Sequence, residues 1–141
     1  MPMQCDIISQ DRIVFQGMVD KISLPGEDGV AGILPHHTPL LMVLKYGVIT
    51  LTREDREEYF TVAGGFAEVT PGHTTILADA AENVEEINTQ RAEEALKRAE
   101  KLLEEGLGQD DDTYIALQNL IKRSNLRLDA VQKYQQRYKQ R

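Results

Sequence analysis

The sequence is poor in the features that mark secreted and membrane-inserted proteins. It has one cysteine, Cys5, which cannot form an internal disulfide and which we expect to be a small apolar residue in a strand. No apolar run approaches the roughly 20 residues that a membrane helix needs, and the first residues lack the basic region of a targeting peptide. We therefore expect a chain that folds where it is made and reaches a membrane only through partners.

Length and charge together suggest two parts with different partners. The 141 residues have room for one domain, or for one small domain with an appendage. The net charge of −7 is uneven, because residues 113–141 hold seven Lys or Arg against one acid, whereas the other 112 residues hold nine bases against 22 acids. We expect the basic tail to seek an acidic protein surface or a nucleotide, and not a nucleic acid, because the rest of the chain is strongly acidic.

Short apolar segments separated by frequent turn residues fill the first part of the chain. Turn signals occur at Pro25-Gly26, at the charged segment 53–56 and at Pro71-Gly72. Strands this short, interrupted this often, favour a β-sandwich or barrel over a parallel sheet. The segments expected as strands are residues 5–9, 12–16, 19–24, 47–52, 58–63, 66–69 and 74–78.

From residue 88 onward the apolar spacing becomes that of a helix. A first stripe recurs at steps of three and four residues, at Ala92, Ala95, Leu96, Ala99, Leu102 and Leu103. Asn88 or Thr89 can cap its start, and Gly106 and Gly108 can end it. Asp110 opens a second helix with the stripe Tyr114, Leu117, Ile121, Ser124, Leu128 and Val131. The two make an αα-hairpin with little core of its own, which we expect to be weakly held.

No group of residues has the pattern of an enzyme active site. The glycine segments 29–32 and 64–65 lack the Lys-Ser/Thr ending of a phosphate-binding loop and are more typical of bulges and turns. Adjacent histidines such as His36 and His37 point to opposite faces of a strand and do not readily share a metal ion. No nucleophile elbow or Ser-His-Asp pattern is legible. We predict no metal site and a chain that is not an enzyme by itself.

Three segments carry a resemblance to a known family. Residues 29–40 read GVAGILPHHTPL, residues 64–69 read GGFAEV and residues 77–82 read LADAAE. In this order, and near these distances, they resemble the landmark motifs of the epsilon subunit of F-type ATP synthases. The expected helical hairpin follows where that family has one, so the resemblance covers essentially the whole chain.

The resemblance implies an α+β fold and a place in a rotary motor. It implies a ten-stranded β-sandwich over residues 1–86, followed by an antiparallel αα-hairpin over residues 87–141. In that family the sandwich binds the gamma subunit and stands on the c-subunit ring of a proton-translocating synthase, at the cytoplasmic face of the bacterial inner membrane. The implied contacts to the ring come from loops at one end of the sandwich, among them the loop of Glu27, Asp28, Gly29 and Val30. His37, in the adjoining turn, is a further implied residue of the interface to the ring or to gamma.

The resemblance also implies a regulatory role for the hairpin. In the family the two helices either fold against the sandwich or extend along gamma into the catalytic head of alpha and beta subunits, where they block ATP hydrolysis. The excess of basic residues in 113–141 agrees with such a contact. The residues selected for it, with a solvated helix face as the alternative, are Lys122, Arg123, Arg127, Lys133 and Arg137.

Some members of the family bind ATP at the folded hairpin, which leaves other functions open. The matching positions here are Glu82, Ile87, Asn88, Arg91, Ala92, Arg98, Arg123 and Arg127. Asn88 stands where the ATP-binding members have an aspartate, which removes a charge-assisted acceptor worth about 1.5–3 kcal/mol. We therefore expect no bound cofactor and a capping role for Asn88. An ATP-binding sensor subunit and an unrelated β-sandwich adaptor are the alternatives to a rotor subunit.

Overall fold

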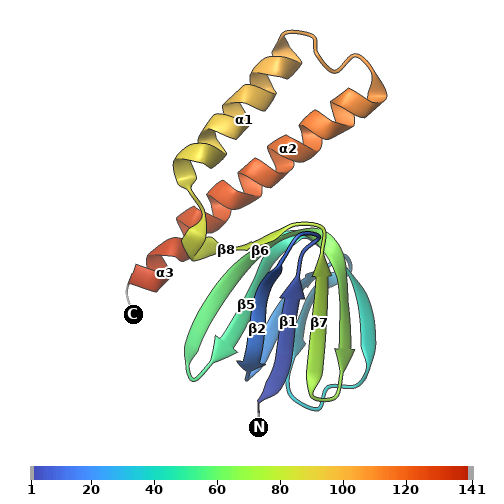
Figure 1. Ribbon diagram of the computed structural model, residues 1–141, viewed down its shortest axis with the longest axis vertical. Helices are drawn as coiled ribbons and strands as arrows, with labels where there is room; N and C mark the ends of the chain where they lie inside the picture. The colour runs from blue at the N-terminus through green and yellow to red at the C-terminus, as the bar shows by residue number, and fades with distance from the viewer. Residues whose placement is uncertain (1, 140–141) are drawn as a thin grey trace. The chain divides into compact units, whose positions relative to one another are not determined.

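The computed structural model describes residues 2–139, which fall into two compact units. The first unit is Met1–Val84 and the second is Glu85–Arg141, a division two residues before the boundary expected between residues 86 and 87. The N-terminal unit is built of strands and the C-terminal unit of helices (Figure 1). None of the helices in the described part has the length and hydropathy that a bilayer crossing requires.

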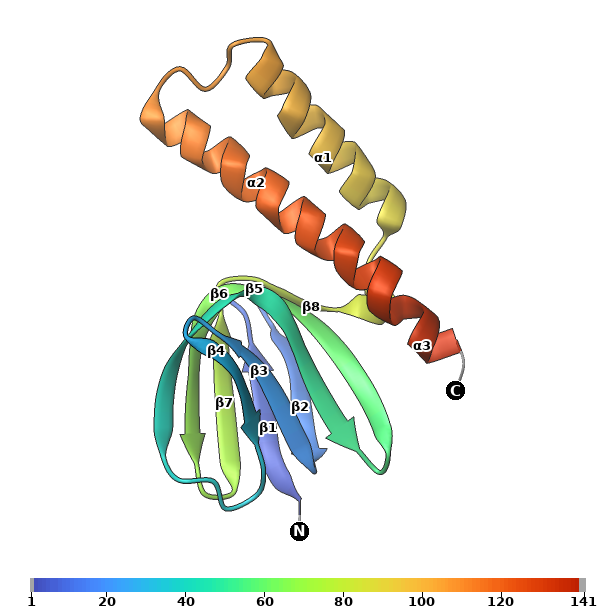
Figure 2. The ribbon, with the colours of Figure 1, turned by 180° about the vertical axis from the view of Figure 1, so that it is seen from behind.

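Eight strands of the N-terminal unit form a sheet that folds over on itself. The strand order is β2-β1-β7-β6-β5-β3-β4, with β8 paired to β6, and every pair is antiparallel except β1 with β7. Figures 1 and 2 show β1 and β7 on one side of this unit and β3 and β4 on the other. The strands are β1 (Met3–Ile8), β2 (Ile13–Val19), β3 (Lys21–Gly26), β4 (Gly29–Ile33), β5 (Leu40–Arg53), β6 (Arg56–Thr70), β7 (His73–Ala78) and β8 (Ala81–Asn83).

The core of this unit lies between the two layers. Alternate residues of β1 point inward, so Met3, Cys5 and Ile7 are all buried. Burial raises the pKa of the Cys5 thiol to about 12, so Cys5 is a packed apolar residue, as expected. Full burial of one large apolar side chain contributes about 1.5–3 kcal/mol. Other fully buried large side chains are Val19, Ile22, Leu24, Ile33, Ile49, Leu51, Phe60, Val62, Val69 and Ile76.

β5 and β6 form one long hairpin whose register stays constant along its whole length. Its turn consists of Glu54 and Asp55, whose φ angles of 51° and 66° are those of the tight left-handed turn that suits twisted antiparallel strands. The Asp20 carboxylate accepts a hydrogen bond of 2.9 Å from the Glu54 backbone N–H. The hairpin expected around the charged segment 53–56 is confirmed.

Gly64 and Gly65 bend β6 without ending it, which corrects the expectation of separate strands at residues 58–63 and 66–69. Their φ angles are +87° and +131°, a region that glycine alone enters easily. β6 pairs with β8 before the glycines and with β7 after them, so the strand passes between the layers at this bend. The described residues therefore contain eight strands where ten were expected, while the class, a sandwich followed by a helical hairpin, is confirmed.

The C-terminal unit is a two-helix hairpin. A 3-10 turn at Val84–Glu86 leads to α1 (Thr89–Glu104), which packs against α2 (Asp111–Ala130). A π-helical turn at Val131–Gln135 and the short α3 (Gln136–Lys139) continue α2. The hairpin is thus the one that the apolar periodicity predicts, extended at its end by a change of helix type.

Capping side chains and glycines set the helix ends where the sequence predicts them. Asn88 accepts a hydrogen bond of 3.0 Å from the N–H three residues later, and Asp110 accepts one of 2.8 Å in the same way. Gly106, at φ +83°, and Leu107 donate their N–H groups back to the last turn of α1. This pattern is the Schellman ending, which glycine favours because it tolerates the left-handed conformation.

The interior of the hairpin is made mostly of small side chains. Ala92 and Ala99 of α1 are fully buried, Ser124 of α2 is nearly so, and Leu117 is the large α2 side chain with little exposure. Tyr114, which the apolar stripe places inside, is instead half exposed. Other large apolar side chains of the hairpin are only half-buried: Leu96, Leu102, Leu103, Ile121 and Leu128. Because the stabilisation from apolar burial scales with area, each contributes less than a fully buried side chain of the sandwich core.

Candidate functional site

Glu27 and Asp28 form an exposed acidic turn between β3 and β4. The Glu27 backbone N–H donates to the Val43 carbonyl at 3.0 Å, which ties the turn to β5. The flanking glycines approach closely, since a Cβ on Gly26 would lie 2.6 Å from the Gly29 carbonyl oxygen. Local backbone contacts therefore fix the position of the two carboxylates.

A groove of about 430 Å³ begins at this turn and is lined by residues 27–31 and 40–43. Its most exposed apolar side chains are Val30 and Leu41, at 74% and 71%. The structure thus brings four of the predicted contact residues, Glu27, Asp28, Gly29 and Val30, into one groove with apolar walls and an acidic turn. Their role in binding a partner stays a prediction.

The fifth predicted contact residue, His37, lies in the turn that follows β4. Its backbone N–H donates to the Leu34 carbonyl at 3.1 Å, and its ring Nδ1 lies 2.7 Å from the Thr38 carbonyl oxygen. A carbonyl only accepts, so this contact requires the proton on Nδ1. The neighbouring His36 has a φ of 67°, so the two histidines occupy a turn and not a strand.

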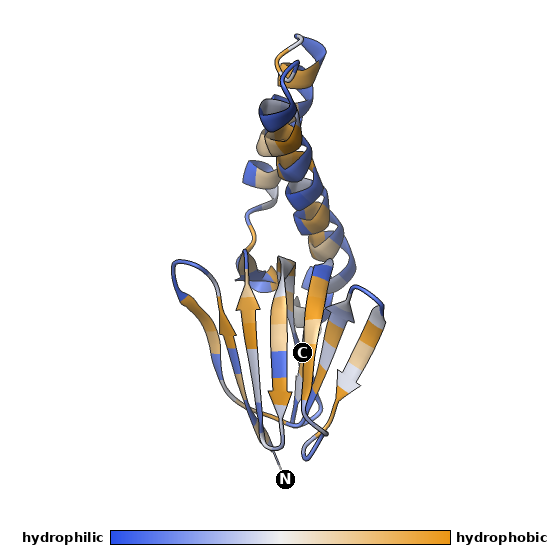
Figure 3. Ribbon diagram, turned by 90° about the vertical axis from the view of Figure 1, so that its right-hand side faces the viewer, coloured by the Kyte–Doolittle hydropathy of each residue, from blue (hydrophilic) through white to orange (hydrophobic). Residues whose placement is uncertain are grey.

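A row of exposed apolar side chains crosses the outer face of β7, β6 and β5. Leu77 lies opposite Phe66, and Phe66 lies opposite Val43, with exposed fractions of 53%, 53% and 45%. Figure 3 shows hydrophobic stretches along the strands of this unit. Contiguous exposed apolar residues mark interaction surfaces. Sequence reasoning missed this row, although residues 40–44 are five apolar residues in succession and leave β5 without a polar face there.

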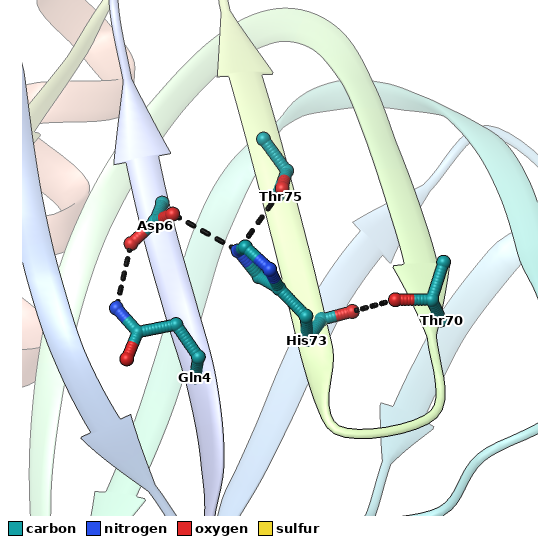
Figure 4. A network of polar contacts seen from close by, with 5 residues as sticks. All are labelled: Gln4, Asp6, Thr70, His73 and Thr75. Atoms are coloured by element: carbon teal, nitrogen blue, oxygen red, sulfur yellow. Dashed lines mark hydrogen bonds and ion pairs between the residues drawn. The ribbon is translucent and has the colours of Figure 1, made fainter.

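A polar cluster occupies the same outer face beside the row (Figure 4). One Asp6 oxygen accepts a hydrogen bond from Gln4 Nε2 at 2.9 Å, and the other Asp6 oxygen lies 2.9 Å from His73 Nε2. The same His73 nitrogen lies 3.4 Å from Thr75 Oγ1. The hydrogen bond from Gln4, with those from His73 and Gln16, holds the pKa of Asp6 below its ordinary value despite burial. The cluster links the parallel strands β1 and β7. Among residues 2–139, no three His, Cys, Asp or Glu side chains are grouped as metal ligands.

The basic residues predicted to contact the catalytic head lie along the second half of the hairpin. Three are on α2, one is in the π-helical turn and one is in α3, in the order Lys122, Arg123, Arg127, Lys133 and Arg137. Lys133 and Arg137 both contact the face of the Tyr134 ring, with Lys133 Nζ at 5.2 Å and Arg137 Cζ at 5.3 Å from the ring centre. Such cation–π contacts restrict the two side chains and keep their charges together.

The residues matched to the ATP-binding motif are distributed over several elements. They are Glu82 in β8, Ile87 and Asn88 before α1, Arg91, Ala92 and Arg98 in α1, and Arg123 and Arg127 in α2. Ala92 and Ile87 are buried, and the side-chain oxygen of Asn88 already accepts a hydrogen bond from the N-terminus of α1. Asn88 thus has the capping role expected for it, while a role of this set in ATP binding stays a prediction.

Two family models cover the chain in succession. The β-sandwich domain of the ATP synthase delta/epsilon chain matches residues 2–84, and the long α-helix domain of the same chain matches residues 85–132. The chain belongs to the ATP synthase delta/epsilon family. The two matched ranges meet at the boundary between the two units of the structure.

Curated relatives place the chain among the epsilon members of this family. It is 44% identical over 99 residues to the ATP synthase epsilon chain of Koribacter versatilis, a match that covers 70% of each chain. It is 39% identical over 134 residues to the epsilon chain of Nitrosococcus oceani, covering 94% of each. The resemblance drawn from residues 29–40, 64–69 and 77–82 is therefore confirmed, and the chain is an epsilon subunit of an F-type ATP synthase.

Solved structures with the same fold come from whole synthases. A chain in the Euglena gracilis mitochondrial ATP synthase, in a structure of OSCP, F1 and the c-ring, gives a TM-score of 0.75 at 22% identity, covering 92% of this chain and 81% of that one. A chain in the central stalk and c-ring of the Tetrahymena thermophila mitochondrial ATP synthase gives 0.59 at 15% identity, covering 93% and 97%. At these identities the likeness concerns the fold.

Proposed function

We propose that this epsilon subunit is a non-catalytic part of the rotor. Its sandwich couples the gamma subunit to the c-subunit ring, and its hairpin restrains ATP hydrolysis by the alpha and beta subunits. In a bacterial cell it works at the cytoplasmic face of the inner membrane, which it reaches through the complex. The observation that carries this proposal is the contrast between a stiff unit with exposed docking surfaces and a helical unit with a weak interior and a basic second half.

The sandwich suits the transmission of torque between two partners. Its core is formed by closely packed side chains from both layers, and packed protein interiors deform little under load. It offers an apolar row, Leu77, Phe66 and Val43, that meets at Val43 the groove beginning at the acidic turn Glu27–Asp28. The exposed apolar side chains and the acidic turn give this surface two kinds of contact for neighbouring subunits.

The hairpin suits a part that changes position. Its fully buried side chains are mostly alanine and serine, and its larger apolar residues are mostly only half-buried, so less apolar burial opposes its rearrangement than in the sandwich. Its second half carries seven Lys or Arg in residues 113–141 against the single acid Asp129, a charge that an acidic surface of the catalytic head would attract. An ATP-sensing role is the second candidate, and Arg91, Arg98 and Arg123, all exposed on the helices, favour it.

The test is a comparison of the intact synthase with one whose epsilon chain lacks residues 113–141. We expect the truncated complex to assemble with all its subunits and to hydrolyse ATP faster. A matched pair of full-length variants removes charge while keeping long side chains: Gln at Lys122, Arg123 and Arg127 should release hydrolysis, whereas Gln at the exposed Glu93, Glu94 and Glu100 of α1 should not. Unchanged hydrolysis in the truncated complex would show that the hairpin is not a brake.

A further inference from the structure

Two like charges share one aromatic ring near the end of the hairpin. Lys133 belongs to the π-helical turn and Arg137 to α3, and both side chains contact the Tyr134 ring, at 5.2 Å and 5.3 Å from its centre. Like charges four residues apart on a helix repel each other. The two cation–π contacts offset this repulsion, and an anion that met both charges would remove it.

The burial of the three side chains suits a support that presents charge to a partner. Tyr134 is half-buried in the hairpin, whereas Lys133 and Arg137 are exposed. Long Lys and Arg side chains normally lose much rotamer freedom when they bind a partner. Because the ring already restricts both side chains, less of this freedom remains to be lost on binding, and the two charges are preorganised.

The helix changes its type at the same place. Val131–Gln135 is a π-helical turn, which contains both Tyr134 and Lys133, and α3 begins at the next residue. π-Helical turns are rare within α-helices and occur frequently at functional sites. The departure from regular α-helix thus coincides with the residues that form the cationic cluster, which supports a role for them beyond holding the hairpin together.

The chemistry of the cluster indicates the kind of partner that fits. The Arg137 guanidinium can hold one carboxylate through two parallel N–H bonds, and the compact Lys133 ammonium can meet a second carboxylate. A nucleotide is matched less well, because the ring face that could stack on its base already contacts the two cations. An acidic protein segment with two neighbouring carboxylates is therefore the favoured partner.

We propose that Tyr134 is a positioning residue of the inhibitory contact, and that it holds Lys133 and Arg137 ready to bind two carboxylates of an acidic segment of the catalytic head. This rests on the proposed function, in which the hairpin restrains hydrolysis by the alpha and beta subunits. The two basic side chains make the contact with the head. Tyr134 acts through them, by keeping both charges at one ring.

The test uses synthase reconstituted with full-length epsilon variants. The rate of ATP hydrolysis, relative to a complex whose epsilon chain lacks residues 113–141, gives the ratio of inhibited to active complexes. We expect Tyr134→Leu to lower this ratio at least about fivefold, because the ring that attracts two cations is lost, and Tyr134→Phe to leave it unchanged. Tyr114→Leu is the matched control, since Tyr114 is half exposed on α2 in a stretch, residues 113–121, without Lys or Arg.

A double-mutant cycle separates positioning from a structural role of the tyrosine. In a chain with Gln at both Lys133 and Arg137, Tyr134→Leu should cause no further loss of inhibition, because the ring then has no cation to hold. Salt gives an independent measurement. The ratio of inhibited to active complexes should fall more steeply with rising salt for the unmodified chain than for the chain with the two Gln residues, because salt screens the contact between the cations and the carboxylates.

The possible failures of this proposal and of the proposed function can be told apart. Unchanged inhibition by Tyr134→Leu, an equal loss with Tyr134→Phe, or an equal effect of Tyr134→Leu in both backgrounds of the cycle would overturn the positioning role and leave the proposed function intact. If removal of residues 113–141 does not raise hydrolysis, both are overturned. Weaker binding of MgATP by the Tyr134→Leu chain in calorimetry, with inhibition unchanged, would assign the ring and its two cations to a nucleotide instead.

Discussion

Substitution of Gly65 by alanine tests whether the bend in β6 depends on a glycine. Gly65 has a φ of +131°, and a Cβ built there would lie 2.2 Å from the Leu77 carbonyl oxygen and 2.8 Å from the Ala78 Cα. Both contacts are with the backbone of β7, which cannot move without disturbing its hydrogen-bonded pairing with β6 and β1. Alanine would therefore add a clash to the cost of a left-handed backbone.

Gly72 provides the matched control, because it isolates the backbone cost. Its φ is +86°, and nothing lies within 4 Å of a Cβ built on it. We expect Gly72→Ala to lower the free energy of unfolding of the N-terminal unit by about 1–2 kcal/mol, the cost of a non-glycine residue in this region. Gly65→Ala should lower it by about 3–5 kcal/mol, since the displacement of β7 is added.

Hydrogen exchange in the full-length chain is the appropriate assay. The slowest amides of β1 and β7 report the global opening of the N-terminal unit, without a contribution from the separate helical unit. A loss of 3–5 kcal/mol is a large part of the 5–15 kcal/mol typical of a domain, so the difference between the two variants is easily resolved. Equal losses for Gly65→Ala and Gly72→Ala would refute the claim that β6 passes against the backbone of β7 at this point.

Three further outcomes are expected. The buried Thr74 hydroxyl has no hydrogen-bond partner among the described residues, so Thr74→Val should raise the free energy of unfolding by about 1 kcal/mol, while Thr75→Val should give no such gain in urea unfolding. The pKa of Asp6 is lowered in the folded state, so the ionised carboxylate stabilises the fold above the ordinary carboxylate pKa, and this contribution is lost as the pH falls through the pKa of the folded state. Asp6→Asn should therefore be less stable at neutral pH. It should also flatten the acid limb of a curve of stability against pH. Asn88→Asp should tighten ATP binding at least about tenfold in calorimetry, and no change would remove Asn88 from any ATP site.

The helical unit could be predicted closely from the sequence because its signals are local. The apolar spacing after residue 88, the capping oxygen of Asn88 and the glycine at 106 act within a few residues of where they stand. The observed α1, Thr89–Glu104, lies between the expected cap at Asn88 and the expected end at Gly106. The π-helical turn could not be predicted, since no residue in Val131–Gln135 carries a distinctive local signal.

The strands were predicted less well because their limits depend on pairing between distant residues. Gly64-Gly65 was interpreted as a break between two strands, yet β5 lies alongside in constant register and keeps the ladder continuous through the bend. β8 has three residues, too few to show an alternation, and its pairing with β6 forms it. Residues 29–32 were interpreted as typical of bulges and turns because of their glycines, whereas pairing with β3 makes them part of β4.

Parts of the candidate site could be predicted and others needed the fold. The family resemblance pointed to the loop that contains the acidic turn Glu27–Asp28, whereas the groove beside it depends on Val43 and Leu41, which approach from β5. The apolar row depends on cross-strand register, because Leu77, Phe66 and Val43 are far apart in sequence and adjacent only in the sheet.

In its proposed role this chain binds two neighbouring subunits of the rotor. The direct measurement is affinity purification of the tagged full-length chain from native membranes solubilised in mild detergent, with identification and stoichiometry of the retained subunits by mass spectrometry. We expect gamma and the c-ring to be retained with it, and a chain with serine at Phe66 and Leu77 to retain less of them. Recovery of the chain without gamma and without the c-ring would contradict it.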